Sequence, residues 1–295
     1  MRRCALLTIE DLSGHVFDDD LLLPPLEEAG WQVESVPWTA PEDWSRFDCA
    51  VVRTTWDYHK QPDRFIDVLE QIDSQTRLFN AYELVRWNVD KVYLRDLADR
   101  GVPVVPTRFG QGLDAEKLAT LRLDLGGKPD AEIVVKPTIS ASADDTFRLR
   151  PGDEEADRAV LDCFAERRYM AQPFIRSVVE EGELSVFYFA GELSHSVLKS
   201  PKADDFRVQE EHGGRLRRVE PEPAALELGR KTLEALEFMP LVARVDMVRS
   251  DGISGDGSAG GFALMELELI EPSLYLSYAP GAATRFADAL SARFA

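Results

Sequence analysis

The sequence predicts a protein of mixed α/β and α+β class, with a parallel α/β unit at the N-terminus and a mostly antiparallel unit at the C-terminus. Two observations support this prediction. Apolar runs alternate with amphipathic segments through the first third of the chain, which is typical of strands covered by helices. After residue 167, apolar strands follow one another, with a hairpin turn expected from Ala190 to Glu192 and an amphipathic helix at 223–237.

Composition narrows the class of protein. The 295 residues, 44% of them hydrophobic, suffice for two or three lobes that share interfaces. No segment resembles a membrane helix or a signal peptide, so we expect a cytoplasmic protein. The net charge of -19 repels phosphate backbones, so neither nucleic acid nor membrane is an expected partner. Cys4, Cys49 and Cys163 lie far apart and are expected to be reduced thiols.

The N-terminal unit is expected over residues 1–100 as a small parallel sheet. The carboxyl ends of its strands would lie along one edge, where ligands of open α/β sheets usually bind. Arg53 lies at such a strand end, in the segment RTTWDYH. Its guanidinium is a candidate clamp for a substrate carboxylate. The alternative is a structural arginine that joins loops. A helical pattern over residues 81–100 ends at Gly101, the expected start of a small middle unit over 101–166.

Three carboxylates mark the C-terminal unit, expected over residues 167–295. Side chains alternate along a strand, so Glu266 and Glu268 share one face of the segment FALMELELI, with Met265, Leu267 and Leu269 behind them. A hairpin would bring Asp246 opposite Glu266. Carboxylates that meet on a half-buried sheet need a cation, and Mg²⁺ accepts oxygen ligands. The alternative is a solvated strand face.

Two lysines have positions that allow more than one interpretation. Lys136 ends the apolar strand EIVVKP, where a buried ammonium group needs an anion, either a phosphate or a structural carboxylate. Lys91 shares the expected helix face with Asn88, a pair that by itself would be read as surface polar residues. A small-residue loop follows at 138–147. This loop has neither the P-loop nor the Rossmann glycine pattern, and GxSxG and HExxH are missing from the sequence.

Taken in order, these segments resemble the ATP-grasp superfamily, especially its branch with bacterial glutathione synthetase and the cycloserine synthetase-like ligases. The resemblance covers residues 80–273. It implies an N-terminal pre-ATP-grasp Rossmann-like lobe, a small middle lobe and a C-terminal lobe with an antiparallel sheet. It also implies ATP as a substrate, Mg²⁺ or Mn²⁺ as the metal, and a homo-oligomer.

The resemblance also implies roles for individual residues. Lys91 and Lys136 match the two nucleotide lysines, and Glu183 matches the acidic residue that holds the ribose. The metal ligands are Asp246, Glu266 and Glu268. The adenine-binding hinge falls on Gln172, Pro173, Phe174 and Ile175, and the groups near the reacting atoms are Lys199, Arg207, Gln209 and, on the substrate side, Ser273.

Two positions depart from the family pattern. Glu268 stands where the family often has Asn, which adds a negative charge to the metal site. Ser185 stands where a glutathione synthetase has Arg, which argues against glutathione synthesis. The resemblance implies an ATP-dependent carboxylate–amine ligase that acts on an amino acid or a small peptide. The alternatives are an intramolecular cyclase, a nucleotide-binding protein without turnover, and an acidic structural protein.

Overall fold

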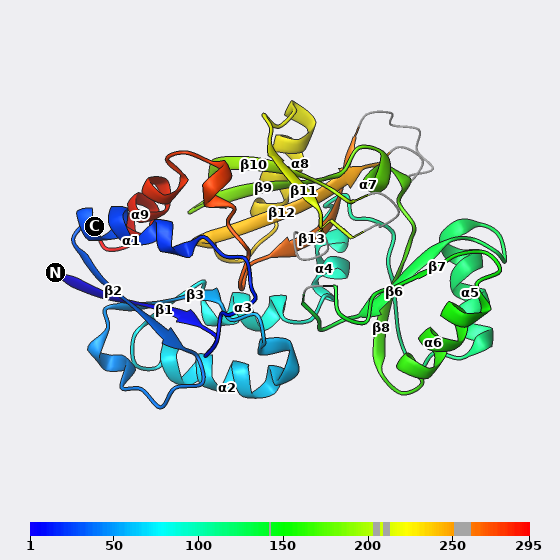
Figure 1. Ribbon diagram of the computed structural model, residues 1–295, viewed down its shortest axis with the longest axis horizontal. Coiled ribbons are helices and arrows are strands. Elements are labelled where there is room, and N and C mark those ends of the chain that lie inside the picture. The colour runs from blue at the N-terminus through cyan, green and yellow to red at the C-terminus, as the bar shows by residue number, and fades with distance from the viewer. Residues whose placement is uncertain (142, 203–206, 209–212, 251–260) are drawn as a thin grey trace.

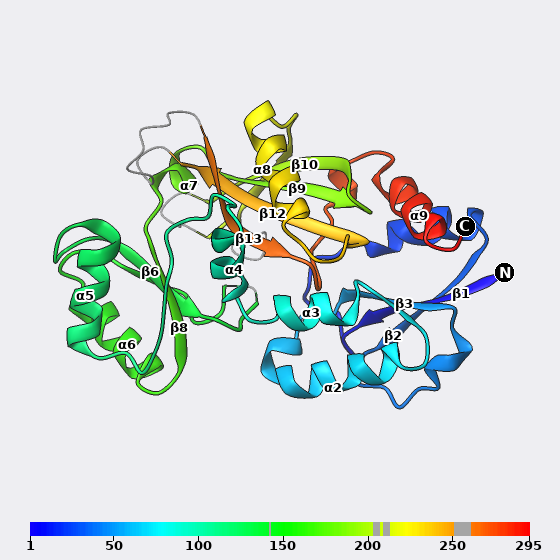
Figure 2. The same cartoon turned by 180° about the vertical axis from the view of Figure 1, so that it is seen from behind.

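The computed structural model describes residues 1–141, 143–202, 207–208, 213–250 and 261–295. These residues form three lobes, each built on its own sheet. The N-terminal and middle lobes lie toward opposite ends of the molecule, and the C-terminal lobe lies above and between them, as Figure 1 and the reverse view in Figure 2 show. The predicted mixture of α/β and α+β structure is confirmed.

The N-terminal lobe is a four-stranded parallel sheet of order β2-β1-β3-β4, as predicted. Alternate residues of β1 face opposite helices, because Cys4 and Leu6 pack with α1 whereas Ala5 and Leu7 pack with α2. This double cover explains why the central strands are continuously apolar. The elements are β1 (Arg2–Thr8), α1 (Leu23–Glu28), β2 (Trp31–Pro37), β3 (Cys49–Thr54), α2 (Pro62–Asp73) and β4 (Arg77–Phe79).

The helix predicted over residues 81–100 is two helices, α3 (Tyr82–Asn88) and α4 (Tyr93–Asp99). The expectation that Lys91 and Asn88 share one helix is therefore wrong. The chain leaves the helix because the backbone N–H of Lys91 donates to the carbonyl oxygen of Thr138, at 2.8 Å. Asp90 then accepts a hydrogen bond from the backbone N–H of Val92, at 3.1 Å, which supports the start of α4.

The middle lobe is an antiparallel sheet of order β5-β8-β6-β7 with α5 and α6 packed on one face. Strand β8 pairs with β5 and β6 and so belongs to this sheet, whereas residues from 167 on were expected in the C-terminal unit. Both helices begin at an aspartate that accepts a backbone N–H of the first turn: Asp114 from Lys117 at 2.8 Å, and Asp153 from Ala156 at 3.0 Å. The elements are β5 (Arg108–Gln111), α5 (Ala115–Gly126), β6 (Ile133–Pro137), β7 (Phe147–Leu149), α6 (Glu154–Phe164) and β8 (Arg168–Pro173).

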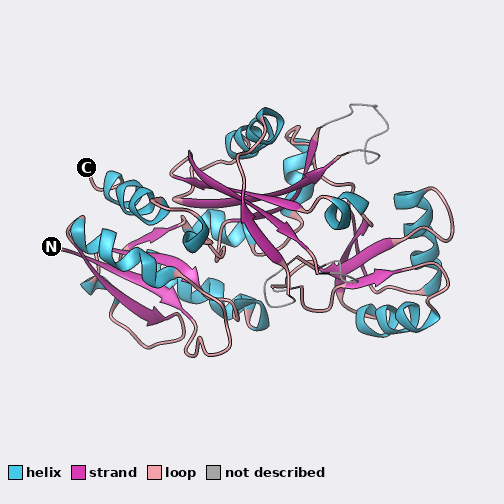
Figure 3. Cartoon of the chain, turned by 45° about the horizontal axis from the view of Figure 1, so that its top comes forward, coloured by secondary structure: helices cyan, strands magenta, loops and turns pink. Residues whose placement is uncertain are grey.

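The C-terminal lobe is a five-stranded antiparallel sheet of order β11-β10-β9-β12-β13, seen crossing the molecule in Figure 3. The predicted hairpin between β9 and β10 turns at Ala190 and Gly191, both with positive φ, as tight hairpins require. The elements are α7 (Arg176–Glu180), β9 (Glu183–Phe189), β10 (Glu192–Ser200), β11 (Arg215–Arg218), α8 (Pro223–Glu234), β12 (Val242–Arg249), β13 (Phe262–Glu268) and α9 (Ala282–Ala292).

The last helix returns to the beginning of the chain. Phe286 and Leu290 of α9 share one core with Leu26 and Trp31 of the N-terminal lobe and with Phe187 of β9. The two termini lie side by side in Figure 1. The N-terminal and C-terminal lobes are therefore joined by a continuous apolar core. Within the described residues, no helix is long and apolar enough to cross a membrane.

Candidate active site

A cavity opens where the three lobes meet, and its walls carry most of the predicted site residues. The middle lobe contributes Lys136 and the segment 172–175, and the C-terminal lobe contributes the polar faces of β9, β10, β12 and β13. The N-terminal lobe contributes aromatic side chains. Charged groups in the described part of the wall are balanced: five are basic, namely Lys91, Lys136, Lys199, Arg207 and Arg244, and five are acidic, namely Glu183, Asp246, Glu266, Glu268 and Glu271.

The register of β12 and β13 sets the order of these charges. Asp246 lies opposite Glu266, as predicted, and Arg244 lies opposite Glu268. The register shifts between Asp246 and Met247. Met265, at this irregularity, lines the cavity beside Glu266, so the expectation that it packs behind the strand is wrong. Leu267 and Leu269 do pack into the apolar core behind the strand, although Leu267 also reaches the cavity wall.

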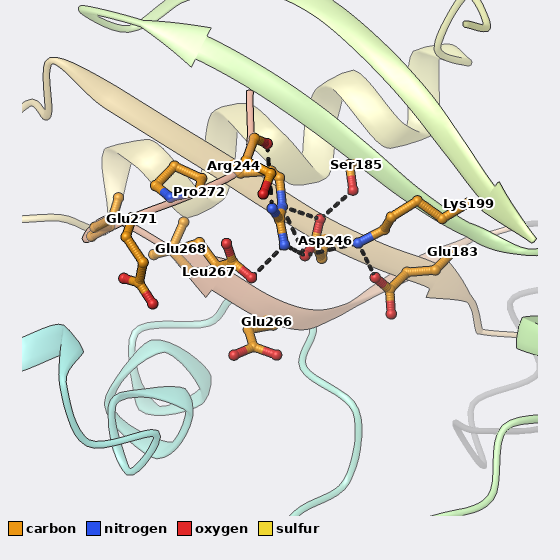
Figure 4. A network of polar contacts seen from close by, with 12 residues as sticks. Glu183, Ser185, Lys199, Arg244, Asp246, Glu266, Leu267, Glu268, Glu271 and Pro272 are labelled. Carbon is orange, nitrogen blue, oxygen red and sulfur yellow. Dashed lines mark hydrogen bonds and ion pairs between the residues drawn. The ribbon is translucent and has the colours of Figure 1, made fainter. Parts of the chain in front are cut away.

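Asp246 is the centre of a buried network of ion pairs, shown in Figure 4. Arg244 donates to both of its carboxylate oxygens, at 3.0–3.1 Å, and Lys199 lies 3.2 Å away. The hydroxyl of Ser185 donates to Oδ1 at 2.5 Å. Burial alone would raise the pKa of Asp246, but Arg244 and Lys199 together hold this pKa at about 2. Asp246 is therefore a fixed negative charge at neutral pH.

Lys199 and Arg244 each join two carboxylates. Lys199 pairs with Glu183 at 2.5 Å as well as with Asp246, and Arg244 pairs with Glu268 as well as with Asp246. Burial and the neighbouring carboxylates Asp246 and Glu266 raise the pKa of Glu268 to about 7, even though Arg244 opposes that rise. Burial therefore makes Glu268 harder to ionise than a free carboxyl, although it pairs with Arg244.

The two lysines expected to hold phosphate both face Glu266. Lys91 Nζ lies 3.2 Å from Glu266 and also donates to the carbonyl oxygen of Ser140 at 2.7 Å. Lys136 Nζ lies 4.0 Å from Glu266. Burial opposes the charge on Glu266, but the two lysines lower its pKa overall. Burial lowers the pKa of Lys136. Without a nucleotide, Glu266 therefore serves as the anion that these lysines need.

The expected metal ligands do not form a preformed cage. In the part of the chain that the structure describes, no group of three His, Cys, Asp or Glu side chains lies close enough to hold a metal ion. Asp246, Glu266 and Glu268 instead each contact protein cations. Their carboxylate oxygens remain suitable donors for a hard divalent cation.

One side of the cavity is apolar. Ile175, Val178 and Val208 form a small core against which Met265 packs, and all four residues line the cavity. The predicted hinge residues Gln172, Pro173, Phe174 and Ile175 lie along the same wall. Arg207 lines the cavity next to Val208. Gln209 lies outside the described residues.

Arg53 is not where the carboxylate-clamp interpretation requires it to be. It is 1% exposed and does not line the cavity. Its Nε and Nη2 donate to the carboxylate of Asp19, at 2.8 and 2.9 Å, and Nη2 also donates to the carbonyl oxygen of Pro272, at 3.0 Å. The structural alternative is correct here, because the hydrogen bonds of Arg53 connect the N-terminal lobe to the segment after β13. Ser273, on that segment, does line the cavity.

Sequence reasoning missed two charged residues of the cavity. Arg244 precedes Asp246 by two residues on the same strand, so the period-2 rule would have placed it on the same face. Glu271 follows the end of β13 and gave no periodic signal. Trp56, Tyr58 and Tyr275 also line the cavity, and only the position of Trp56 and Tyr58 after a strand end indicated this.

Comparison with known proteins agrees with this geometry. Residues 4–80 match the family described as D-cycloserine synthetase DcsG, N-terminal domain. The cycloserine biosynthesis protein DcsG of Streptomyces lavendulae is 36% identical over 294 residues, which cover 93% of this chain and 94% of that protein. The crystal structure of D-cycloserine synthetase DcsG superposes with a TM-score of 0.83 and 31% identity, over 99% of this chain and 100% of that one.

A more distant structure shares the fold. The D-alanine–D-alanine ligase of Bacillus anthracis superposes with a TM-score of 0.67 at 15% identity, over 100% of this chain and 98% of that one. The identity with DcsG over nearly the whole of both chains places the present chain in the same family. The chain therefore belongs to the ATP-grasp superfamily, in its cycloserine synthetase-like branch, and is an ATP-dependent carboxylate–amine ligase.

Proposed function

We propose that this ligase uses Mg-ATP to convert the carboxylate of an amino acid or small peptide into an acyl phosphate, which an amine then attacks. The observation that best supports the proposal is the cavity between the lobes, with basic side chains fixed by carboxylates on β12 and β13. Phosphoryl transfer needs positioning and charge stabilisation more than covalent participation by the protein. Fixed charges in a half-buried cavity supply both.

The nucleotide would lie along the middle-lobe wall. The apolar group around Ile175 and Met265 suits a flat base, and Glu183 suits the ribose hydroxyl groups. Lys91 and Lys136 would bind the phosphates. Both now contact Glu266, so phosphate would take over the lysines and leave the Glu266 carboxylate available to a cation.

A divalent cation fits this exchange. Because the described walls already balance acidic and basic groups, a polyanionic triphosphate would leave the cavity negative unless cations accompany it. Asp246, Glu266 and Glu268 would hold the cation through carboxylate oxygens, as Mg²⁺ prefers, with Mn²⁺ as the alternative. When bound, the ion neutralises phosphate charge.

The reaction would have two steps. A carboxylate oxygen of the substrate attacks the γ-phosphorus, and ADP leaves. The amine nitrogen then attacks the acyl carbon, inorganic phosphate leaves, and the amine loses a proton. Arg207 would stabilise charge on the transferred group, and Gln209 and Ser273 would contact the substrates. Lys199, held between Glu183 and Asp246, would fix the positions of both carboxylates near the reacting atoms.

The loop over residues 138–147 is suited to cover this reaction. The carbonyl oxygens of Thr138 and Ser140 accept hydrogen bonds from Lys91, so the start of the loop is bonded to one of the two lysines that would bind phosphate. Asp144, further along the loop, lies 3.2 Å from His59 of the N-terminal lobe. Closure would protect the acyl phosphate from water, which would otherwise hydrolyse it.

Two measurements test the proposed function. Phosphate release is measured with Mg-ATP over a panel of amino acids and small peptides, each alone and in pairs, and at least one combination should stimulate release. Mg-ATP should also protect the protein from thermal unfolding, and Lys136→Ala should remove this protection. Equal protection of the wild type and of Lys136→Ala would refute the nucleotide site.

A second candidate is ring closure within one substrate molecule. It is favoured by the similarity to D-cycloserine synthetase DcsG over the full length of both chains. In this case a single compound carries both the carboxylate and the amine. Ring closure would be established if the enzyme released one phosphate for each molecule of a single compound, with no second amine present.

A further inference from the structure

Glu271 has a carboxylate for which neither the ion-pair network nor the proposed chemistry gives a role. It follows β13 by three residues and faces the cavity. Among the residues that the structure describes, none forms a hydrogen bond or an ion pair with its carboxylate. Figure 4 shows this group apart from the dashed contacts that join Arg244, Asp246 and Lys199.

The backbone of Glu271 is held firmly. The indole N–H of Trp56 donates to the carbonyl oxygen of Glu271 at 3.0 Å, and Arg53 Nη2 donates to that of Pro272 at 3.0 Å. Both donors come from the end of β3 or directly after it, so the N-terminal lobe fixes this turn. An unpaired side chain on a fixed backbone is therefore presented to the cavity, not left free on a loose loop.

The cations closest to this end of β13 are already engaged. Arg244 holds Asp246 and Glu268, and Lys91 holds Glu266 and the carbonyl oxygen of Ser140. Burial, and next the charge of Glu268, raise the pKa of Glu271 to about 8. A cationic group brought by a ligand would favour the ionised form of this carboxyl and pair with it.

The surroundings also favour a small cation. Trp56, Tyr58 and Tyr275 line the cavity with Glu271, and aromatic faces attract ammonium groups through their quadrupole. Tyr58 is buried, and after burial itself the charge of Glu271 is the largest influence that raises the pKa of its hydroxyl. The phenol and the carboxylate are thus electrostatic neighbours.

We propose that the Glu271 carboxylate binds the protonated amino group of a substrate, at the side of the cavity formed by the N-terminal lobe. This inference rests on the proposed function and adds a specificity determinant to it. Two substrate groups have this chemistry: the α-ammonium group of the activated amino acid and the ammonium group of the amine that attacks it. The ion pair would select substrates that carry such a group over their N-acylated analogues.

Trapping with hydroxylamine separates the two sources. Hydroxylamine is uncharged at neutral pH and converts acyl phosphates into hydroxamates, so it replaces the second substrate without needing Glu271. The variant is Glu271→Gln, which keeps the shape and removes the charge. The control is Glu28→Gln, the same substitution at an exposed carboxylate.

If Glu271 binds the α-ammonium group, Glu271→Gln raises KM for the amino acid in the hydroxamate assay about 10- to 100-fold, as expected for a lost charge-assisted hydrogen bond. If it binds the attacking amine, hydroxamate formation is unchanged and KM for that amine rises by a similar factor. In both cases kcat for hydroxamate formation and thermal protection by Mg-ATP stay close to the wild-type values. Both quantities would fall if Glu271 had only a structural role.

Two other outcomes would overturn different parts of the proposal. If neither KM changes in Glu271→Gln, or if protection by Mg-ATP is lost together with activity, the role proposed for Glu271 is wrong while the ligase chemistry stands. If the wild type forms no hydroxamate with any amino acid or peptide tested, the proposed function itself fails, and the role of Glu271 fails with it.

Discussion

Residues 103–105 pair with Leu264 at the outer edge of β13, and beyond this point side chains from α3 and α4 close the edge. Removing one of these side chains should leave main-chain groups of β13 without partners. Asn88 Nδ2 donates to the carbonyl oxygen of Leu267 at 2.9 Å, and its Oδ1 accepts the N–H of Leu269 at 3.0 Å. Tyr93 adds a third contact, because its hydroxyl accepts the N–H of Leu267 at 3.0 Å. These contacts complete the hydrogen bonding of the strand that carries Glu266 and Glu268.

Asn88→Ala leaves two buried main-chain groups without partners. Each such group costs about 1–3 kcal/mol, so the free energy of unfolding should fall by about 2–6 kcal/mol. Tyr93→Phe removes one acceptor and should cost about 1–3 kcal/mol. Because β13 carries the carboxylates expected to bind the metal, both variants should also weaken Mg-ATP binding. Urea unfolding measures the first effect, and titration calorimetry with Mg-ATP measures the second.

Asn80→Ala is the matched control. Asn80 makes four such hydrogen bonds, to Leu241, Val242 and Leu269, but lies outside the cavity wall. It should lose at least as much stability and keep most of its affinity for Mg-ATP. Loss of less than about 0.5 kcal/mol in Asn88→Ala would show that water replaces the side chain. Equal loss of affinity in Asn80→Ala and Asn88→Ala would refute a specific role for β13.

Two further predictions concern stability. A Cβ at Gly229 would lie 2.0 Å from the hydroxyl oxygen of Tyr188, so Gly229→Ala should destabilise the fold by about 1–3 kcal/mol in urea unfolding, and adding Tyr188→Phe should recover part of this. Burial lowers the pKa of His195 to about 4 from 6.5 in the unfolded chain. The folded state therefore favours the neutral ring, and its contribution of about 3 kcal/mol is present above pH 6.5 and lost as the pH falls towards 4. His195→Gln should show a smaller loss of stability than the wild type between pH 7 and pH 4; equal losses would contradict this assignment.

Much of the fold follows from local pattern. The parallel N-terminal sheet, the β9–β10 hairpin and the pairing of Asp246 with Glu266 were all predicted, because period-2 alternation and turn residues act within a few neighbouring residues. The break between α3 and α4 was not predicted. It depends on Thr138, which lies far from Lys91 in the sequence and bonds its backbone N–H. No helical periodicity reveals a partner supplied by another lobe.

The charges of the site were more visible in the sequence than their pairings. The strand pattern identified Asp246, Glu266 and Glu268 as site residues, the family resemblance added Lys91 and Lys136, and all five line the cavity. What neither could give is which cation faces which carboxylate, because that depends on the bulge in β13 and on contacts between lobes. The consequence is chemical. Three carboxylates without partners would form a metal site even before nucleotide binds. Here the carboxylates are already paired with lysine and arginine, so we expect them to exchange these partners when nucleotide and cation bind together. The affinity for Mg²⁺ alone should then be weak, and the affinity for Mg²⁺ in the presence of ATP should be much stronger.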